Sequence, residues 1–550
     1  MTDHALDTII QSVKIVDGTG RPSKTGDVGI KGDKIVDIGN LGSNCTNLVA
    51  ASGVTLMPGI IDVHTHYDAQ ITWDNTLSPS SSLGVTTVVI GNCGFGIAPC
   101  PEAQRETLLR NLSVVEGMNE NSLLEGTRWN FATFPDYLDR LEDIKPFANV
   151  AALIGHSTIR TAIMGAEASI RIQPTNEELN RMEYLVDEGL EAGAIGFASS
   201  FSPNHSGFNG LPMPSTIASD KEIFRLISAL KRKRRAFVVA SGPRAHPEYI
   251  EGMLNESGCP AFIVTVLAMH NDSDPNAALD YYEKAKEVSN RGQEIYIHAN
   301  PHPLSFDFSL ENPYPFFAHS AFDEIKKSDH EAKSQIYKSK KFREKFRADL
   351  NIHKKGALFN GEWEKIELNE TPITKLAEDA GVDPLSWFFD QNIKSQFIGK
   401  LFQNNDDAVE KLLKHPNALL ALSDAGAHLE FLCDAGFGLY FLSHWVKKRN
   451  SFSIEEGIKK LTLDIAERYR IKDRGSIEIG KFADLVLFDE SNLGLSNLKK
   501  IADLPAGGYR MVRESSGVVG TWVNGTRTKD ESGLVLNATG PGRVLKEFNF

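Results

Sequence analysis

The stretch from residue 57 to residue 99, MPGIIDVHTHYDAQITWDNTLSPSSSLGVTTVVIGNCGFGIAP, decides the fold. It holds two short apolar runs, 59–61 and 85–90, that are typical of buried strands. The first run ends in His64-Thr65-His66, and because alternate side chains of a strand share a face, both imidazoles point the same way. The second ends in Asn92-Cys93-Gly94. Two strand ends that carry His, His and Cys predict a metal site at the mouth of a parallel barrel.

The composition is that of a large globular enzyme. The chain has 550 residues, of which 41% are hydrophobic and 24% charged, ample for a sizeable core. Its formal net charge of −13 argues against nucleic acid or an anionic membrane as a partner. The sequence shows no apolar run near the roughly 20 residues of a spanning helix, and its acidic start, MTDHALDTII, lacks the features of a signal peptide. Five scattered cysteines do not form a disulfide framework, so we expect a cytoplasmic protein in which Cys93 is available as a ligand.

The middle of the chain alternates predicted strands and helices. Counted from Ile60, eight apolar runs follow one another in a β–α rhythm, and eight is the number that closes a barrel. A capping box of Thr175 and Glu178 opens one of the intervening helices. The predicted strands lie at residues 60–61, 85–90, 150–154, 194–197, 237–239, 262–267, 294–297 and 418–422.

The two ends of the chain share a sequence pattern that differs from that of the middle. Short apolar pieces separated by Gly and Asp turns predict small β structure, and we expect both termini to build one β-sandwich; two unrelated terminal sheets are the alternative. The segment after the seventh strand is too long for a loop, has helical runs at 323–350 and 372–380, and is predicted to be an inserted lid. The predicted division is 1–56 and 471–550 for the β-sandwich, 57–302 for barrel strands one to seven, 303–403 for the lid and 404–470 for the end of the barrel.

Polar residues follow the predicted strands at the ends that face a barrel's active site. His64 and His66 follow the first strand, Cys93 the second, His156 the third and Asp424 the eighth. Imidazole, thiolate and carboxylate together suit zinc. A zinc ion lowers the pKa of bound water to about 7, and Asp424 is the natural general base to take its proton and pass it to a leaving nitrogen. The pattern predicts a zinc-dependent amide hydrolase.

These motifs resemble those of the amidohydrolase superfamily. The segment PGIIDVHTH at 58–66 is similar to its opening signature, and GNCG at 91–94 resembles the D-aminoacylase (N-acyl-D-amino-acid deacylase) branch. The resemblance covers nearly the whole chain. It implies a (β/α)₈ TIM-like barrel with a small β-sandwich from both termini, a zinc site that Cys93 bridges, and Asp424 as the catalytic acid/base. Later segments that support it are GHSTIR at 155–160, GAIGF at 193–197, SDAGAH at 423–428 and GKFADL at 480–485.

Two histidines that such deacylases place after strands five and six are absent or displaced. The fifth predicted strand is followed by Ser241-Gly242-Pro243-Arg244, with no histidine, and His270 lies near the end of the sixth but past the ligand position. A second zinc ion, with His205, His270 or His298 among its ligands, is the alternative to a mononuclear site. We expect one zinc ion per chain, with the ligand set His64, His66, Cys93 and Asp424.

The expected substrate is a small N-acyl compound. The carboxylate of an N-acyl amino acid favours a bidentate guanidinium, and Arg160 and Arg244 lie just beyond predicted barrel strands. His205 belongs to a segment after the fourth strand that is predicted to line the substrate pocket. A homo-oligomer is left open.

Three functions remain open at this point. The first, which we favour, is zinc-dependent hydrolysis of N-acyl-D-amino acids or related N-acyl compounds. The second is opening of a cyclic imide or hydantoin, or cleavage of a carbamate, on the same site. The third is a metal-poor, non-enzymatic homologue, which the missing fifth-strand histidine keeps open and the retained His64, His66, Cys93 and Asp424 argue against.

Overall fold

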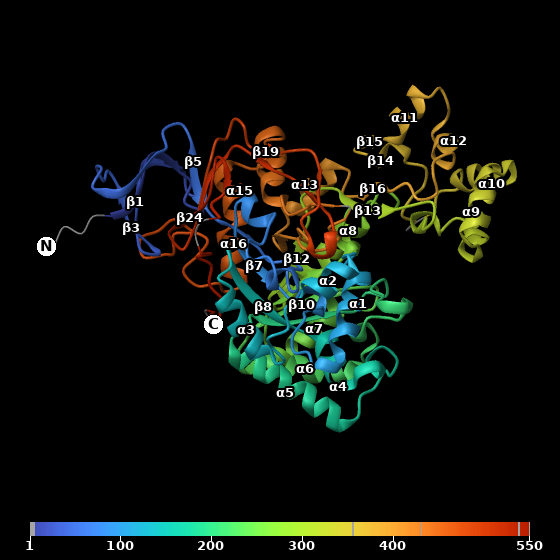
Figure 1. Cartoon of the computed structure of the whole chain (residues 1–550), viewed down its shortest axis with the longest axis horizontal. Helices are drawn as coiled ribbons and strands as arrows, with labels where there is room; N and C mark the ends of the chain where they lie inside the picture. The colour runs from blue at the N-terminus through green and yellow to red at the C-terminus, as the bar shows by residue number, and fades with distance from the viewer. Residues whose placement is uncertain (1–5, 355–356, 431, 537–538, 549–550) are drawn as a thin grey trace. The chain divides into compact units, whose positions relative to one another are not determined.

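The structure is a computed structural model that describes residues 6–354, 357–430, 432–536 and 539–548 (Figure 1). The chain divides into two compact units. The first consists of Met1–Val266, Tyr282–Ala299 and His415–Phe550, and the second of Leu267–Tyr281 and Asn300–Lys414.

The first unit contains an eight-stranded parallel sheet whose strands pair in chain order from β6 to β17. A parallel bridge between Thr65 and Ala425, just beyond β6 and β17, joins the two outer strands. The backbone N–H of His66 donates to the Ala425 carbonyl (2.7 Å), and that of Asp424 donates to the His64 carbonyl (3.1 Å). The predicted barrel is therefore confirmed. Its strands are β6 (Ile60–Asp62), β7 (Val85–Ile90), β8 (Asn149–Gly155), β9 (Gly196–Ser200), β10 (Ala236–Ala240), β11 (Ala261–Val264), β12 (Ile295–Ala299) and β17 (Ala418–Leu420).

Several strand boundaries differ from the predicted ones, by three residues or fewer. β9 begins at Gly196 rather than at residue 194. β11 ends at Val264 instead of residue 267, because the chain turns into a 3₁₀-helix at Val266–Ala268. Apolar side chains of the strands, such as Val89, Val238 and Phe262, join Ile465 and Tyr469 in one buried cluster, and burial of such groups stabilises the barrel by about 25 cal/mol per Å².

Helices connect the barrel strands. The predicted capping box is present: the Thr175 hydroxyl accepts from the Glu178 N–H, and α5 then runs to Ala192. No helix among the described residues is long and apolar enough to cross a membrane. The helices are α1 (Arg105–Val115), α2 (Glu120–Gly126), α3 (Phe134–Ile144), α4 (His156–Met164), α5 (Asn176–Ala192), α6 (Asp220–Ser228), α7 (Pro247–Ser257), α8 (Ala277–Asn290), α14 (Phe437–Tyr440), α15 (Ile454–Leu461) and α16 (Leu463–Arg468).

Both ends of the chain build one nine-stranded sheet, so the alternative of two unrelated terminal sheets was wrong. β5 pairs antiparallel with β18, and Figure 1 shows the blue N-terminal strands beside the red C-terminal ones. The sheet covers a core that includes Ile10, Leu56, Leu485 and Trp522. Its strands are β1 (Leu6–Ile15), β2 (Lys24–Lys31), β3 (Lys34–Gly39), β4 (Cys45–Ala50), β5 (Thr55–Pro58), β18 (Leu485–Phe488), β23 (Val518–Val523), β24 (Thr526–Asp530) and β25 (Gly533–Leu534).

The second unit has its own sheet and aromatic core. Helices are present in both predicted helical runs, but the sheet, ordered β13-β16-β14-β15, was not predicted because its strands are short and β13 pairs with β16 across about 90 residues. Phe316, Phe346 and Phe388 pack together inside it. The lid role stays a prediction. The elements are β13 (Leu304–Phe308), β14 (Ile366–Leu368), β15 (Thr371–Pro372), β16 (Phe397–Phe402), α9 (His330–Lys338), α10 (Lys340–Leu350), α11 (Ile373–Asp379), α12 (Pro384–Phe389) and α13 (Asp406–Leu413).

Gly426→Ala tests the closure of the barrel. Gly426 has φ +97°, and a Cβ there would lie 2.7 Å from the His66 carbonyl. The N–H of the same residue, His66, donates one of the hydrogen bonds that close the barrel. We expect a loss of unfolding free energy of roughly 2 kcal/mol or more, from left-handed backbone and steric overlap together. Urea unfolding measures it. Gly480→Ala is the control, because Gly480 has φ +91° with nothing within 4 Å, and equal losses in the two variants would contradict this account.

Candidate active site

Hydrogen bonds hold the ends of the first two barrel strands together. The Asn92 side-chain amide donates to the carbonyls of Thr65 (3.3 Å) and Val89 (2.9 Å). The Asp68 carboxylate accepts the Gly91 N–H at 3.1 Å, just before the turn that carries Cys93. These contacts bring Cys93, from the end of β7, to the histidines after β6.

The structure brings the four predicted metal-site side chains together. Nε2 of His64 lies 3.7 Å from the Cys93 sulfur and 3.4 Å from Asp424 Oδ1. Nε2 of His66 lies 3.1 Å from the same Asp424 oxygen. His64, His66 and Cys93 are buried, whereas the Asp424 side chain is 38% exposed. The cluster thus has a buried donor side and one carboxylate at its open side.

The backbone at this cluster is held in the left-handed region. Cys93 has φ +55°, Asp424 +54° and His428 +52°. Such backbone costs a non-glycine residue about 1 kcal/mol or more and persists only where the surroundings enforce it. Residues in this conformation cluster at functional sites, and here they aim the Cys93 and Asp424 side chains into one space.

The cluster is strongly polarised. Burial lowers the pKa of His64, but the charges of Cys93 and Asp424 outweigh it and raise that pKa to about 9. Burial raises the pKa of Asp424, yet the adjacent His64 and His66 imidazoles hold it well below its usual value. Among the described residues, His64 Nδ1 and His66 Nε2 are buried without a hydrogen-bond partner. Two imidazoles, a thiol and a carboxylate with these unused nitrogens fit a zinc-like ion.

Glu116 belongs to the site, although the sequence analysis did not name it. It follows α1, is 4% exposed, and places Oε1 3.4 Å from Nδ1 of His66. His428, the last residue of the segment 423–428, lies beside it as well, with Nε2 3.8 Å from Asp424 Oδ2. Glu116 was missed because it ends a helix rather than a barrel strand. Among the described residues, the groups able to hold a metal are His64, His66 and Cys93, and His66, Glu116 and Asp424.

His205 lies beside this cluster. Its Nδ1 shares a 2.7 Å hydrogen bond with the Ser200 hydroxyl, and its ring meets the edge of Phe95 at 5.2 Å. Burial lowers its pKa to about 4, although the charge of Asp424 acts against this shift. A neutral imidazole therefore neighbours the site at pH 7. Its role in binding substrate stays a prediction.

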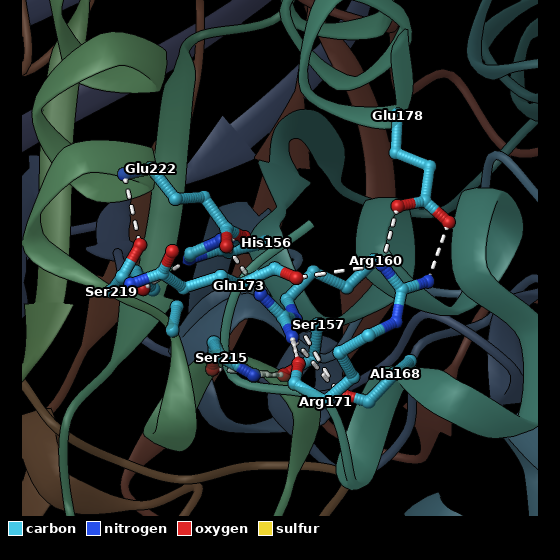
Figure 2. Close-up of polar contacts among 12 residues, drawn as sticks. His156, Ser157, Arg160, Ala168, Arg171, Gln173, Glu178, Ser215, Ser219 and Glu222 are labelled. Atoms are coloured by element: carbon cyan, nitrogen blue, oxygen red, sulfur yellow. Dashed lines mark hydrogen bonds and ion pairs between the residues drawn. The ribbon is translucent and has the colours of Figure 1, made fainter. Parts of the chain in front are cut away.

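The geometry does not support Arg160 as a substrate-binding residue. It lies in α4, is fully buried, and forms an ion pair with Glu222 (Figure 2). Its guanidinium also donates to the carbonyls of Ala168 (3.3 Å) and Arg171 (2.6 Å). A buried guanidinium must be paired and hydrogen-bonded. These contacts meet that need and occupy the donors that would otherwise bind a substrate carboxylate. Arg160 differs from the prediction because α4 begins directly after β8, and the helix directs the Arg160 side chain into the interior.

His156 belongs to the same buried network and not to the metal cluster. Its Nε2 lies 2.9 Å from Glu222 Oε1, and its Nδ1 lies 2.8 Å from the Ser199 hydroxyl (Figure 2). Burial lowers the pKa of His156, so the ring is neutral at pH 7. The network links α4, which follows the third strand, to the fourth strand β9 and to α6 after it.

The remaining predicted residues have other partners. Arg244 is paired with Asp220 and donates to the Ala218 carbonyl at 3.1 Å, so substrate binding by Arg244 stays a prediction. His298 lies on β12, its ring 5.6 Å from that of His64, and shares a 2.9 Å hydrogen bond with the Tyr469 hydroxyl. His270 belongs to the second unit, where its Nε2 lies 2.9 Å from Asp272.

The family model of the amidohydrolase family matches residues 47–348 and 367–528, most of the chain. The chain therefore belongs to the amidohydrolase family and is a hydrolase that acts on C–N bonds. This assignment removes the non-enzymatic alternative.

Particular relatives narrow the comparison. The chain is 26% identical to D-aminoacylase of Alcaligenes xylosoxydans xylosoxydans over 549 residues, which covers 98% of this chain and 97% of that protein. It is 27% identical to N-acyl-D-aspartate deacylase of the same organism over 547 residues, with 98% and 95% covered.

Two solved structures share the fold. A D-aminoacylase described as having a binuclear metal centre matches with a TM-score of 0.68 at 22% identity, covering 98% of this chain and 100% of that one. N-acyl-D-glutamate deacylase from Bordetella bronchiseptica, complexed with zinc and a phosphonate inhibitor, matches with a TM-score of 0.66 at 22% identity, covering 99% and 100%. The barrel with a sheet from both termini is thus confirmed.

Glu222→Gln tests the buried network. It leaves the Arg160 guanidinium buried beside a neutral amide, and loss of one partner of a buried pair costs about 3–5 kcal/mol of unfolding free energy. We expect a loss of about 3 kcal/mol by denaturant unfolding. Glu183→Gln, at a half-exposed pair with Arg225, is the control and should cost about 1 kcal/mol or less. A Glu222→Gln protein as stable as the control would show that the pair does not support the fold.

Proposed function

We propose that this amidohydrolase is zinc-dependent and cleaves the amide C–N bond of N-acyl-D-amino acids or related N-acyl compounds. One observation carries the proposal: His64, His66, Cys93 and Asp424 converge where the first and eighth strands meet. The D-aminoacylase and deacylase relatives support the substrate class. The cytoplasmic location expected from the sequence is kept as part of the proposal.

His64, His66 and Cys93 would hold the metal, with Asp424 at the open side of the cluster. A zinc ion supplies Lewis acidity that makes water a better nucleophile at neutral pH. We favour one ion, because within the described residues neither His270 nor His298 joins a metal-ligand group. The related D-aminoacylase described as binuclear makes two ions the alternative.

Asp424 carries the proton in this scheme. The adjacent His64 and His66 imidazoles lower the pKa of its carboxyl group and keep it ionised, as a general base must be. Its partial exposure lets it meet water and substrate, while the histidines hold Oδ1 in place. The carboxylate accepts a proton from the attacking water and then donates it to the leaving nitrogen, so the amine departs neutral.

A hydrolysis screen tests the proposal. The zinc-loaded protein is offered N-acyl-D-amino acids, N-acyl-L-amino acids and cyclic amides; released primary amine is measured for the N-acyl compounds, and ring opening is followed by chromatography for the cyclic ones. We expect release from the D-compounds, its loss after chelation and its return with added zinc. Hydrolysis of cyclic amides alone would move the function to the hydantoinase alternative. Turnover that survives complete removal of metal would overturn the metal-dependent scheme.

Asp424→Asn should keep the fold and the zinc but lose turnover. The variant lacks the carboxylate that takes the proton in this scheme, and general acid–base catalysis contributes about 10²–10⁴-fold. We expect kcat/KM to fall by at least 100-fold while the thermal midpoint and zinc content stay near wild type. Asp187→Asn, at an exposed ion pair with Arg232, is the matched control. Near-normal turnover in Asp424→Asn would place the base elsewhere.

A further inference from the structure

A buried carboxylate stands behind one of the two strand-one histidines. Glu116 is 4% exposed, and among the described residues its ion-pair partner is the His66 ring, with Oε1 3.4 Å from Nδ1. A buried carboxylate is costly unless a donor or a positive charge pairs with it, and Nδ1 of His66 lies in position to do so.

The two nitrogens of His66 face different partners. Nδ1 is on the Glu116 side, whereas Nε2 lies 3.1 Å from Asp424 Oδ1, in the cluster with His64. A ring whose Nδ1 carries the proton keeps the lone pair of Nε2 for a metal. Carboxylates in this position orient metal-binding histidines and raise their basicity.

His64 provides an internal contrast. Its Nδ1 is buried without a hydrogen-bond partner, and its Nε2 faces Cys93 and Asp424. Only His66 of the pair therefore has a carboxylate behind it among the described residues. If every buried imidazole in this site required a partner on both nitrogens, His64 Nδ1 would have one too. The carboxylate beside His66 therefore needs a separate explanation.

The fold fixes Glu116 to the loop that carries Asp424. Glu116 caps the C-terminus of α1, and its carbonyl accepts the His428 N–H at 2.7 Å. Gly117 follows with φ +55°, and a Cβ there would lie 2.8 Å from His428 Nδ1. The close approach therefore requires glycine, and α1 and the loop 424–428 hold His66 between their carboxylates.

We propose that Glu116 is a positioning residue that fixes the tautomer and orientation of His66 as a metal ligand. The inference rests on the proposed metal-dependent function. Glu116 does not touch the substrate or the reacting atoms in this scheme. Its effect passes through the affinity of His66 for the metal.

The test is zinc affinity, measured by competition with a chromophoric chelator at pH 7.5. We expect Glu116→Gln to weaken zinc binding by about 10–100-fold, as is typical when such a partner of a metal-binding histidine is lost. Glu120→Gln is the matched control, because Glu120 pairs with Arg110 on the surface and should bind zinc like wild type. Glu116→Gln affinity within twofold of wild type overturns the proposal.

A second measurement needs no variant. In the zinc-loaded protein with ¹⁵N-labelled histidine, nuclear magnetic resonance should show a proton on His66 Nδ1 and a metal-bound Nε2. A metal-bound, unprotonated Nδ1 would make Glu116 a fellow ligand and overturn the positioning role. A wild-type chain that binds no zinc overturns both this inference and the proposed function, whereas zinc binding without hydrolysis of N-acyl compounds overturns the function alone.

Discussion

The meeting of the first and eighth barrel strands is the constraint on which the site depends. Backbone hydrogen bonds from His66 to Ala425 and from Asp424 to His64 join these strand ends, and the side chains of three of those residues form the cluster. Closure of the sheet and assembly of the site are thus one structural event. Any change that loosens this seam separates the histidines from the carboxylate.

The seam also explains why the backbone there departs from ordinary conformations. Cys93, Asp424 and His428 adopt left-handed angles, which are uncommon for residues other than glycine. The packed barrel around these residues holds their backbone in place, because its many contacts outweigh the local conformational cost. The buried Arg160–Glu222 pair fixes the structure after the third and fourth strands, where it joins α4 to α6.

Much of this could be predicted from the sequence, and the exceptions share a cause. Apolar runs mark all eight barrel strands, and His64, His66, Cys93 and Asp424 were found because each follows such a run. Glu116 follows a helix, and its place beside His66 depends on a fold that brings α1 to the eighth strand's loop. Arg160 follows a strand, but the helix turn that begins at once directs it into the interior. Position along the chain identifies strand ends, not the direction of long side chains beyond them.

The pairing of β5 with β18 has a consequence for how the protein is made. β5 ends one residue before the first barrel strand, and the Gly59 N–H between them donates to the Asp484 carbonyl at 2.8 Å. During synthesis β5 must wait for more than 400 residues before its partner β18 leaves the ribosome. Contacts of such long sequence separation form late, so the nascent chain holds its metal-binding motif in an incomplete structure until the C-terminal strands arrive.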